Sequence, residues 1–195
     1  MEIRKYRPED REYVRKICMD TAKKGYNKNP RKRECMALMF IDYNIECEPD
    51  NCFVAVEDGI PCGYMVCYTD RALFEKKMKE VYIPKIMKKS FILGVFTQIC
   101  VATSRKLYKE FGAGEFHINI DEKYQGKKIG PKLMTAMALN LREKNQKYMY
   151  LVTQNRKTRG YGFYMHYGFF EAKKCGMGTL CLAYDVSKID EKLDK

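Results

Sequence analysis

Residues 114–134, with the sequence GEFHINIDEKYQGKKIGPKLM, constrain the possible fold more than any other part of the chain. From Phe116 to Ile120 apolar and polar side chains alternate, which is typical of a strand with one buried face. From Ile129 onward apolar residues recur at helical spacing, and Pro131 suits the first turn of a helix. The segment is therefore predicted to form a strand, a short turn that contains glycine, and the start of a helix.

The turn, Gln125–Gly130, is a candidate site for a phosphate or pyrophosphate. The free amides in the first turn of a helix carry partial positive charge, and three lysines between residues 127 and 132 add cations. The turn matches neither the Walker pattern GxxxxGK[ST] nor the dinucleotide pattern GxGxxG. Taken alone, it is equally compatible with a phosphate site and with a basic, solvated strand-to-helix turn.

The same turn resembles the acetyl-coenzyme A loop of the GNAT superfamily of N-acetyltransferases. In that loop Gln or Arg is followed by two residues, Gly, one residue, and Gly or Ala. The matching residues are Tyr124, Gln125, Gly126, Lys127, Ile129 and Gly130. Lys128 stands where the family has its middle glycine. If that position needs a conformation that only glycine adopts easily, Lys128 strains the loop; if not, it adds a cation.

A second resemblance lies in the C-terminal third of the chain. GNAT enzymes commonly have a short helix that reads Asn-x-x-small-x-x-x-Tyr-x-x-x-Gly-Phe. Tyr164, Gly168 and Phe169 match this pattern, and Gly160 takes the small position. The Asn position holds a lysine, with Asn155 two residues earlier. Two motifs in the right order and at the right distance favour membership, and the resemblance spans the chain, weakest between residues 71 and 113.

The resemblance implies an α/β (α+β) fold with a mixed, mostly antiparallel GNAT-type central sheet of about six to seven strands flanked by helices. Strands are predicted at 2–6, 52–56, 63–68, 116–120, 147–153, 169–175 and 179–185, and helices at 8–24, 33–47, 131–144 and around residue 164. A helical insertion, 71–112, is expected between the third and fourth strands, with breaks at Pro84 and near Gly94. One domain is expected over residues 1–187, followed by a charged, frayed tail at 188–195.

The resemblance also implies roles for particular residues. The strand near residue 118 would offer backbone groups to the pantetheine arm and thioester, and the turn would hold the pyrophosphate. The residues expected to bind acetyl-CoA are Ile118, Asn119, Ile120, Gln125, Gly126, Lys127, Lys128, Ile129, Gly130 and Asn155. Tyr164 would protonate or hydrogen-bond the departing thiolate.

The general base is left open. Glu115, His117 and Asn119 share one face of the predicted strand. His117 has an ordinary pKa suited to proton transfer near neutral pH, whereas Glu115 would act directly or through a water molecule.

Charge and composition limit the kinds of binding partner that are expected. The net charge of +12 attracts acidic ligands, nucleic acids and anionic surfaces alike, but no nucleic-acid-binding motif accompanies it, so no specific nucleic acid or membrane partner is expected. The nine scattered cysteines form no CxxC pair, and the two histidines favour no metal site. The chain has no apolar run long enough for a membrane span and no signal-peptide core, which predicts a reduced, cytoplasmic protein.

The predicted function is transfer of the acetyl group of acetyl-CoA to a primary amine, by direct attack in a ternary complex. The acceptor is expected to be a small-molecule amine or a protein or peptide amine, and a homodimer is compatible with the sequence. The alternative is a catalytically degenerate GNAT fold that binds acyl-CoA or a partner without turnover. Ile41–Glu46 is similar to a segment of bacterial acetyltransferases related to the acetyltransferase-like domain of O-GlcNAc hydrolases.

Overall fold

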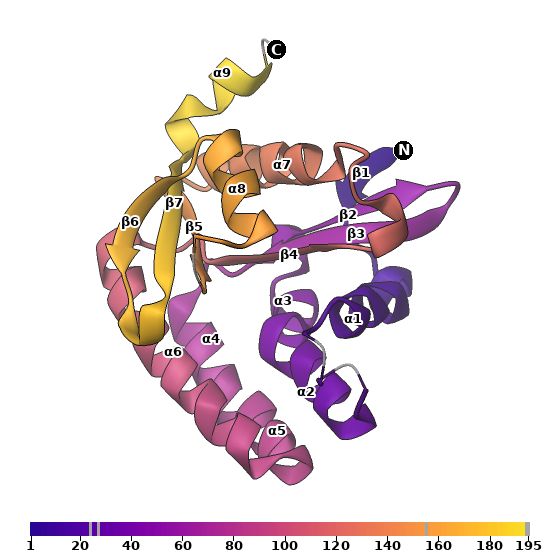
Figure 1. Ribbon diagram of the computed structural model, residues 1–195, viewed down its shortest axis with the longest axis vertical. Coiled ribbons are helices and arrows are strands. Elements are labelled where there is room, and N and C mark those ends of the chain that lie inside the picture. Colours follow the sequence, from indigo (N-terminus) through magenta and orange to yellow (C-terminus); the bar gives the residue numbers. More distant parts are fainter. Residues whose placement is uncertain (24, 27, 155, 194–195) are drawn as a thin grey trace.

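The computed structural model describes residues 1–23, 25–26, 28–154 and 156–193, and these contain seven strands in two antiparallel sheets (Figure 1). The first sheet has the order β1-β2-β3-β4, with β1 at Glu2–Lys5, β2 at Cys52–Glu57, β3 at Ile60–Cys67 and β4 at Phe116–Ile120. The second has the order β5-β7-β6, with β5 at Tyr148–Thr153, β6 at Phe170–Lys174 and β7 at Leu180–Asp185. A parallel bridge between Glu115 and Tyr150 joins the sheets. The predicted mixed, mostly antiparallel GNAT-type sheet is confirmed.

The central strands β2 and β3 are buried on both faces, which explains their nearly continuous apolar sequences. Val54 and Tyr64 face one core, which they share with α1 (Arg11–Asp20), α2 (Pro30–Phe40) and α3 (Asp42–Cys47). Phe53 and Met65 face a second core, formed with α7 (Ile129–Glu143) and α8 (Arg159–Tyr167). Figure 1 shows α7 and α8 on one side of β4 and α1 to α3 on the other.

The predicted helical insertion between β3 and β4 is confirmed. The predicted break at Pro84 is wrong, and the break predicted near Gly94 lies four residues earlier, at Ser90. Helix α4 (Arg71–Lys77) continues through a π-helical turn, Met78–Tyr82, into α5 (Ile83–Lys89). The wider turn accommodates the ring and the missing N–H of Pro84, so the helix does not break there. The chain reverses at Ser90 instead, before α6 (Phe91–Phe111).

Gly94 lies inside α6 and allows α5 and α6 to approach closely. A Cβ atom at this position would lie 2.2 Å from Cγ of Met87. The residue therefore serves helix packing, and its usual tendency to end helices is overridden by that contact.

Two other boundaries differ from the sequence prediction. The helix predicted over residues 33–47 is divided at Ile41, whose φ of −132° and ψ of −33° lie outside helical values. The tail from residue 188 is not frayed as far as Leu193, because Val186–Ile189 forms a 3-10 turn and Asp190–Leu193 forms α9. Ile189 is fully buried against the second core.

Gly114 fixes the contact between the two sheets, and its replacement should destabilise the protein strongly. Its φ is +124°, and a Cβ atom would lie 2.2 Å from the carbonyl oxygen of Tyr148. We expect Gly114→Ala to lower the free energy of unfolding by more than about 3 kcal/mol, measured by chemical denaturation. Gly162→Ala is the control: this glycine lies within α8 with open space around it, and its replacement should be stabilising by about 1 kcal/mol. Equal stability of the two variants would contradict this role for Gly114.

Candidate functional site

Strands β4 and β5 touch at one end and separate at the other. The amide of Tyr150 donates to the carbonyl of Gly114 at 2.9 Å, beside the parallel Glu115–Tyr150 bridge. Beyond that point β4 is paired with β3, and β5 with β7. A cavity of about 520 Å³ opens where β4, the turn after it and α8 come together.

Most of the residues expected to bind acetyl-CoA meet in this cavity. Its lining includes Ile118, Asn119, Ile120, Gln125, Gly126, Lys128, Ile129 and Gly130. Lys127 does not line it; the ammonium of Lys127 lies 4.8 Å from the ring centroid of Tyr124. Asn155 lies outside the residues that the structure describes. The turn from Gln125 to Gly130 and the end of β4 therefore form one concave surface.

The turn presents the start of α7 to the cavity. The N-cap of α7 is Lys128, whose side chain makes no capping hydrogen bond. The first amides of the helix have no partner within the helix itself, so they are available to an anion. A Cβ atom on Gly130 would lie 2.9 Å from the ring of Phe163. The missing side chain thus lets α8 pack directly against this helix end.

Lys128 adopts the left-handed conformation that the family pattern assigns to glycine. Its φ is 58° and its ψ is 22°, which costs a non-glycine residue roughly 1–2 kcal/mol. We expect Lys128→Gly to raise the free energy of unfolding by about 1 kcal/mol in denaturant titrations. Lys128→Ala is the matched control, since it removes the same ammonium but keeps the strained backbone. A glycine variant no more stable than the alanine variant would disprove the strain.

Tyr164 comes from α8 and lines the opposite wall of the same cavity. Its ring packs edge-on against Phe116, with centroids 6.1 Å apart, and against Phe169 at 5.4 Å. Burial raises the pKa of the phenol. Among the described residues none hydrogen-bonds the Tyr164 hydroxyl, so this group is available to a ligand in the cavity.

Several lining residues were not among those predicted to bind the cofactor. They are Thr21 from the end of α1, and Glu122, Pro131, Arg159 and Phe163. Arg159 donates from Nη1 to Oε1 of Gln125 at 3.2 Å, which ties α8 to the turn. A basic residue at the start of a helix opposite a phosphate loop was a usable signal; the position of Thr21 depends on tertiary packing alone.

Glu115 and His117 share one face of β4 with Asn119, opposite Ile118 and Ile120, and neither of them lines the cavity. The His117 ring stacks on Phe40 of α2 with centroids 4.7 Å apart. Its Nδ1 is 3.0 Å from the Tyr64 hydroxyl, which also accepts from Nδ2 of Asn119 at 3.0 Å. The Tyr64 hydroxyl therefore joins His117 and Asn119 in one hydrogen-bonded group. Burial lowers the pKa of His117 to about 4.

Glu115 belongs to a hydrogen-bond network that reaches into the insertion. The Tyr68 hydroxyl donates to Oε2 of Glu115 at 2.7 Å and accepts from Nη1 of Arg71 at 2.8 Å. Arg71 is buried and donates further to Ser104 and Glu75. Burial raises the pKa of Glu115, while the Tyr68 hydrogen bond and the charge of Arg71 oppose the rise. Arg71 thus orients Tyr68, and Tyr68 orients the carboxylate.

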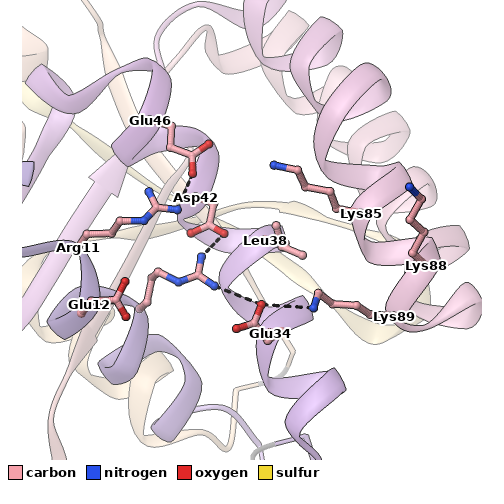
Figure 2. Close-up of a pocket in the computed structure, with 10 residues that line it drawn as sticks. Arg11, Glu12, Glu34, Leu38, Asp42, Glu46, Lys85, Lys88 and Lys89 are labelled. Atoms are coloured by element: carbon pink, nitrogen blue, oxygen red, sulfur yellow. Dashed lines mark hydrogen bonds and ion pairs between the residues drawn. The ribbon is translucent and has the colours of Figure 1, made fainter.

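A second cavity, of about 570 Å³, lies between α1, α2, α3 and α5 and is lined almost entirely by charged residues (Figure 2). Its arginines are paired within the protein. Arg11 Nη2 lies 2.6 Å from Glu46 Oε1, and Arg15 pairs with both Asp42 and Glu34. These pairs connect three helices, so we assign this cavity to packing of the first core rather than to catalysis.

The described residues contain no group of three or more His, Cys, Asp or Glu side chains placed to hold a metal ion. Within the same part of the chain, no helix is long and apolar enough to cross a membrane.

A helix N-terminus therefore faces the opening between β4 and β5, which is suited to an elongated ligand with an anionic group. The family model for the acetyltransferase (GNAT) family matches residues 14–169. The chain therefore belongs to the GNAT family, as the two sequence motifs predicted.

Solved structures show the same fold. SsHAT is 22% identical to this chain, with a TM-score of 0.77 over 95% of this chain and 98% of that one. The PaiA N-acetyltransferase of Thermoplasma acidophilum, solved in complex with coenzyme A, is 14% identical with a TM-score of 0.61, over 94% and 98%. The polyamine N-acetyltransferase of Drosophila melanogaster, which forms N-acetylagmatine, is 14% identical with a TM-score of 0.58, over 94% and 98%. No curated protein matches the chain by sequence.

Proposed function

We propose that this protein is an N-acetyltransferase that transfers the acetyl group of acetyl-CoA to a primary amine. The observation that carries the proposal is the cavity that joins the end of β4, the start of α7 and Tyr164. An elongated thioester with a charged pyrophosphate fits these features, since the helix start offers amides and the β4 end offers backbone groups. The small-amine specificity of two neighbours, polyamine and agmatine N-acetyltransferases, supports an amine acceptor.

The reaction needs three contributions from the protein. The amides from Gly126 to Gly130 and the ammonium of Lys128, which lines the cavity, hold the pyrophosphate. The exposed edge of β4 positions the thioester for attack. The amine then attacks the carbonyl carbon, the C–S bond breaks, and the hydroxyl of Tyr164 gives its proton to the departing thiolate.

Glu115 is the better candidate for removing the proton from the amine, directly or through water. Its raised pKa makes it a stronger base than an ordinary carboxylate. His117, with a pKa near 4 and its Nδ1 engaged by Tyr64, is a weak acceptor at neutral pH. We therefore assign His117 to shaping the acceptor side of β4, together with Phe40.

The pH dependence of kcat/KM distinguishes these two bases. With Glu115 as base, activity falls as the pH drops through the pKa of Glu115, which lies above the ordinary value of 4.5. Tyr68→Phe removes the hydrogen bond that favours the ionised carboxylate, so this acidic limb should move to higher pH by about one unit. Glu115→Gln should abolish the activity, and the acidic limb of the pH profile should disappear with it. A limb that stays at the same pH in Tyr68→Phe, or lies near pH 4 in the unmodified protein, would identify a different base.

Calorimetry with acetyl-CoA tests cofactor binding, and release of CoA thiol across a panel of amines tests turnover. We expect binding in the micromolar range and acceptor-dependent thiol release. No binding at millimolar acetyl-CoA would refute the proposal. Binding without release over small amines, amino sugars and lysine peptides would favour the second candidate, a degenerate GNAT fold. The strained Lys128 is the observation that motivates this second candidate.

A further inference from the structure

The outer face of α6 carries the largest concentration of exposed apolar side chains in the described chain. Ile92, Phe96 and Ile99 recur at i, i+4 and i+7 and form one stripe, with Phe91 beside its start. Their exposed fractions are 69% for Phe91, 81% for Ile92, 42% for Phe96 and 51% for Ile99. A single exposed apolar residue is ordinary, but four within nine residues of one helix need an explanation.

This stripe begins at the tip of a projecting helical hairpin. Helices α5 and α6 pack side by side, and the contact of Gly94 with Met87 holds them close. The chain reverses at Ser90, so Phe91 and Ile92 lie at the end of the hairpin, which Figure 1 shows at the end of the molecule remote from both termini. The apolar tip is therefore sterically accessible to a large, flat partner.

The segment that contains the hairpin is also basic. Residues 71–111 contain ten Lys or Arg and three Asp or Glu, so about a fifth of the chain carries seven of the twelve net positive charges. Lys85, Lys88 and Lys89 lie on α5, in the last two turns before the chain reverses at Ser90, and they border the charged cavity of Figure 2. Lys89 lies 3.5 Å from Glu34, whereas Lys85 and Lys88 form no ion pair within the described residues.

A partner for this surface must accept both its positive charge and its apolar side chains, and three kinds of partner can be compared on that basis. A second copy of this chain would place two segments of net charge +7 against each other and would be repelled. A nucleic acid would satisfy the lysines, but Ile92 and Ile99 have no aromatic face on which bases stack. An anionic lipid surface satisfies both requirements, because it offers negative headgroups above an apolar layer.

We propose that the tip of the α5–α6 hairpin docks on anionic membrane surfaces. Phe91, Ile92, Phe96 and Ile99 enter the boundary between headgroups and acyl chains, and the lysines of α5 contact the headgroups. The protein lies on the membrane and does not cross it. This docking is independent of acetyl transfer, since none of these side chains lines the acetyl-CoA cavity.

Vesicle co-sedimentation of the full chain tests the proposal. Vesicles of phosphatidylcholine with about 30% phosphatidylserine should retain the protein, and pure phosphatidylcholine vesicles should not. Raising the salt from about 0.1 M to 0.5 M should weaken retention several-fold. Ile92→Ser and Phe96→Ser should each lower the partition coefficient about tenfold or more, and Lys88→Glu should lower it several-fold.

Two matched variants make the result specific. Ile60→Ser removes an exposed isoleucine from the start of β3, with an exposed fraction of 50%, close to the 51% of Ile99. Lys188→Glu reverses an exposed lysine near the C-terminus. Both variants should bind as the unmodified protein does. All variants are compared at equal helical content by circular dichroism. Equal retention on neutral vesicles, or loss of retention in the control variants, would overturn the proposal. Retention on RNA or DNA without retention on vesicles, or dimerisation abolished by Ile92→Ser without vesicle binding, would assign the surface to those partners instead.

Discussion

Replacing Tyr164 by phenylalanine is expected to lower kcat by about 10²–10⁴-fold, the range for loss of a general acid. The substitution removes one hydroxyl and keeps the ring that packs against Phe116 and Phe169. The dissociation constant for acetyl-CoA should change little, because the phosphate contacts come from the start of α7. Thiol-release kinetics at saturating substrates measure the first quantity, and calorimetry measures the second.

Tyr161→Phe is the matched control for this experiment. Tyr161 lies on the same helix, but its hydroxyl donates to Oε1 of Glu171 at 2.8 Å and does not line the cavity. Its loss should leave kcat within about twofold of the unmodified value. If Tyr164→Phe keeps similar turnover, the thiolate takes its proton from water or from the Glu115 face of β4, and the role given to Tyr164 is wrong.

Gly130→Glu is expected to weaken acetyl-CoA binding by at least about 100-fold. A carboxylate in the first turn of α7 would occupy the amides and repel the pyrophosphate. The new Cβ would also lie 2.9 Å from Phe163 and displace the facing helix. Calorimetric titration with acetyl-CoA measures the loss.

Two further variants distinguish the effect of the new carboxylate charge from the effect of the added side-chain volume and from a general loss of stability. Gly130→Ala introduces the Cβ without the charge and should retain part of the affinity. Gly176→Glu places the same carboxylate on an exposed turn with open space around the Cβ position, and its affinity should match the unmodified protein. Equal binding by Gly130→Glu and Gly176→Glu would show that the pyrophosphate lies elsewhere.

The sequence predicted the elements of the cofactor side well because that information is local. Alternation from Phe116 to Ile120, the turn glycines and Pro131 each express a backbone preference that needs no distant partner. The same holds for Tyr164 and the glycine at 168, whose φ of 115° ends α8 in the left-handed region.

The insertion was harder to predict because its breaks depend on tertiary contacts. Glycine often marks the end of a helix, so the sequence alone suggested a break near Gly94. Only its close contact with Met87 explains why Gly94 lies inside α6. Likewise, Glu115 and His117 looked equivalent along the strand. Burial separates their pKa values, because it raises that of Glu115 and lowers that of His117. Their hydrogen-bond partners, Tyr68 for one and Tyr64 for the other, come from β3 or the residue just after it.

The path from Arg71 through Tyr68 to Glu115 has a consequence for how such enzymes diverge. Arg71 is the first residue of α4, so an element outside the shared sheet contributes to the proton affinity of a group on the central strand. With Glu115 as the proposed base, shortening or exchanging the insertion would change the pH optimum even if no residue of the sheet or of the cavity beside β4 were altered. We therefore propose that an insertion at this point of the fold adjusts the proton affinity of Glu115 while the sheet stays the same.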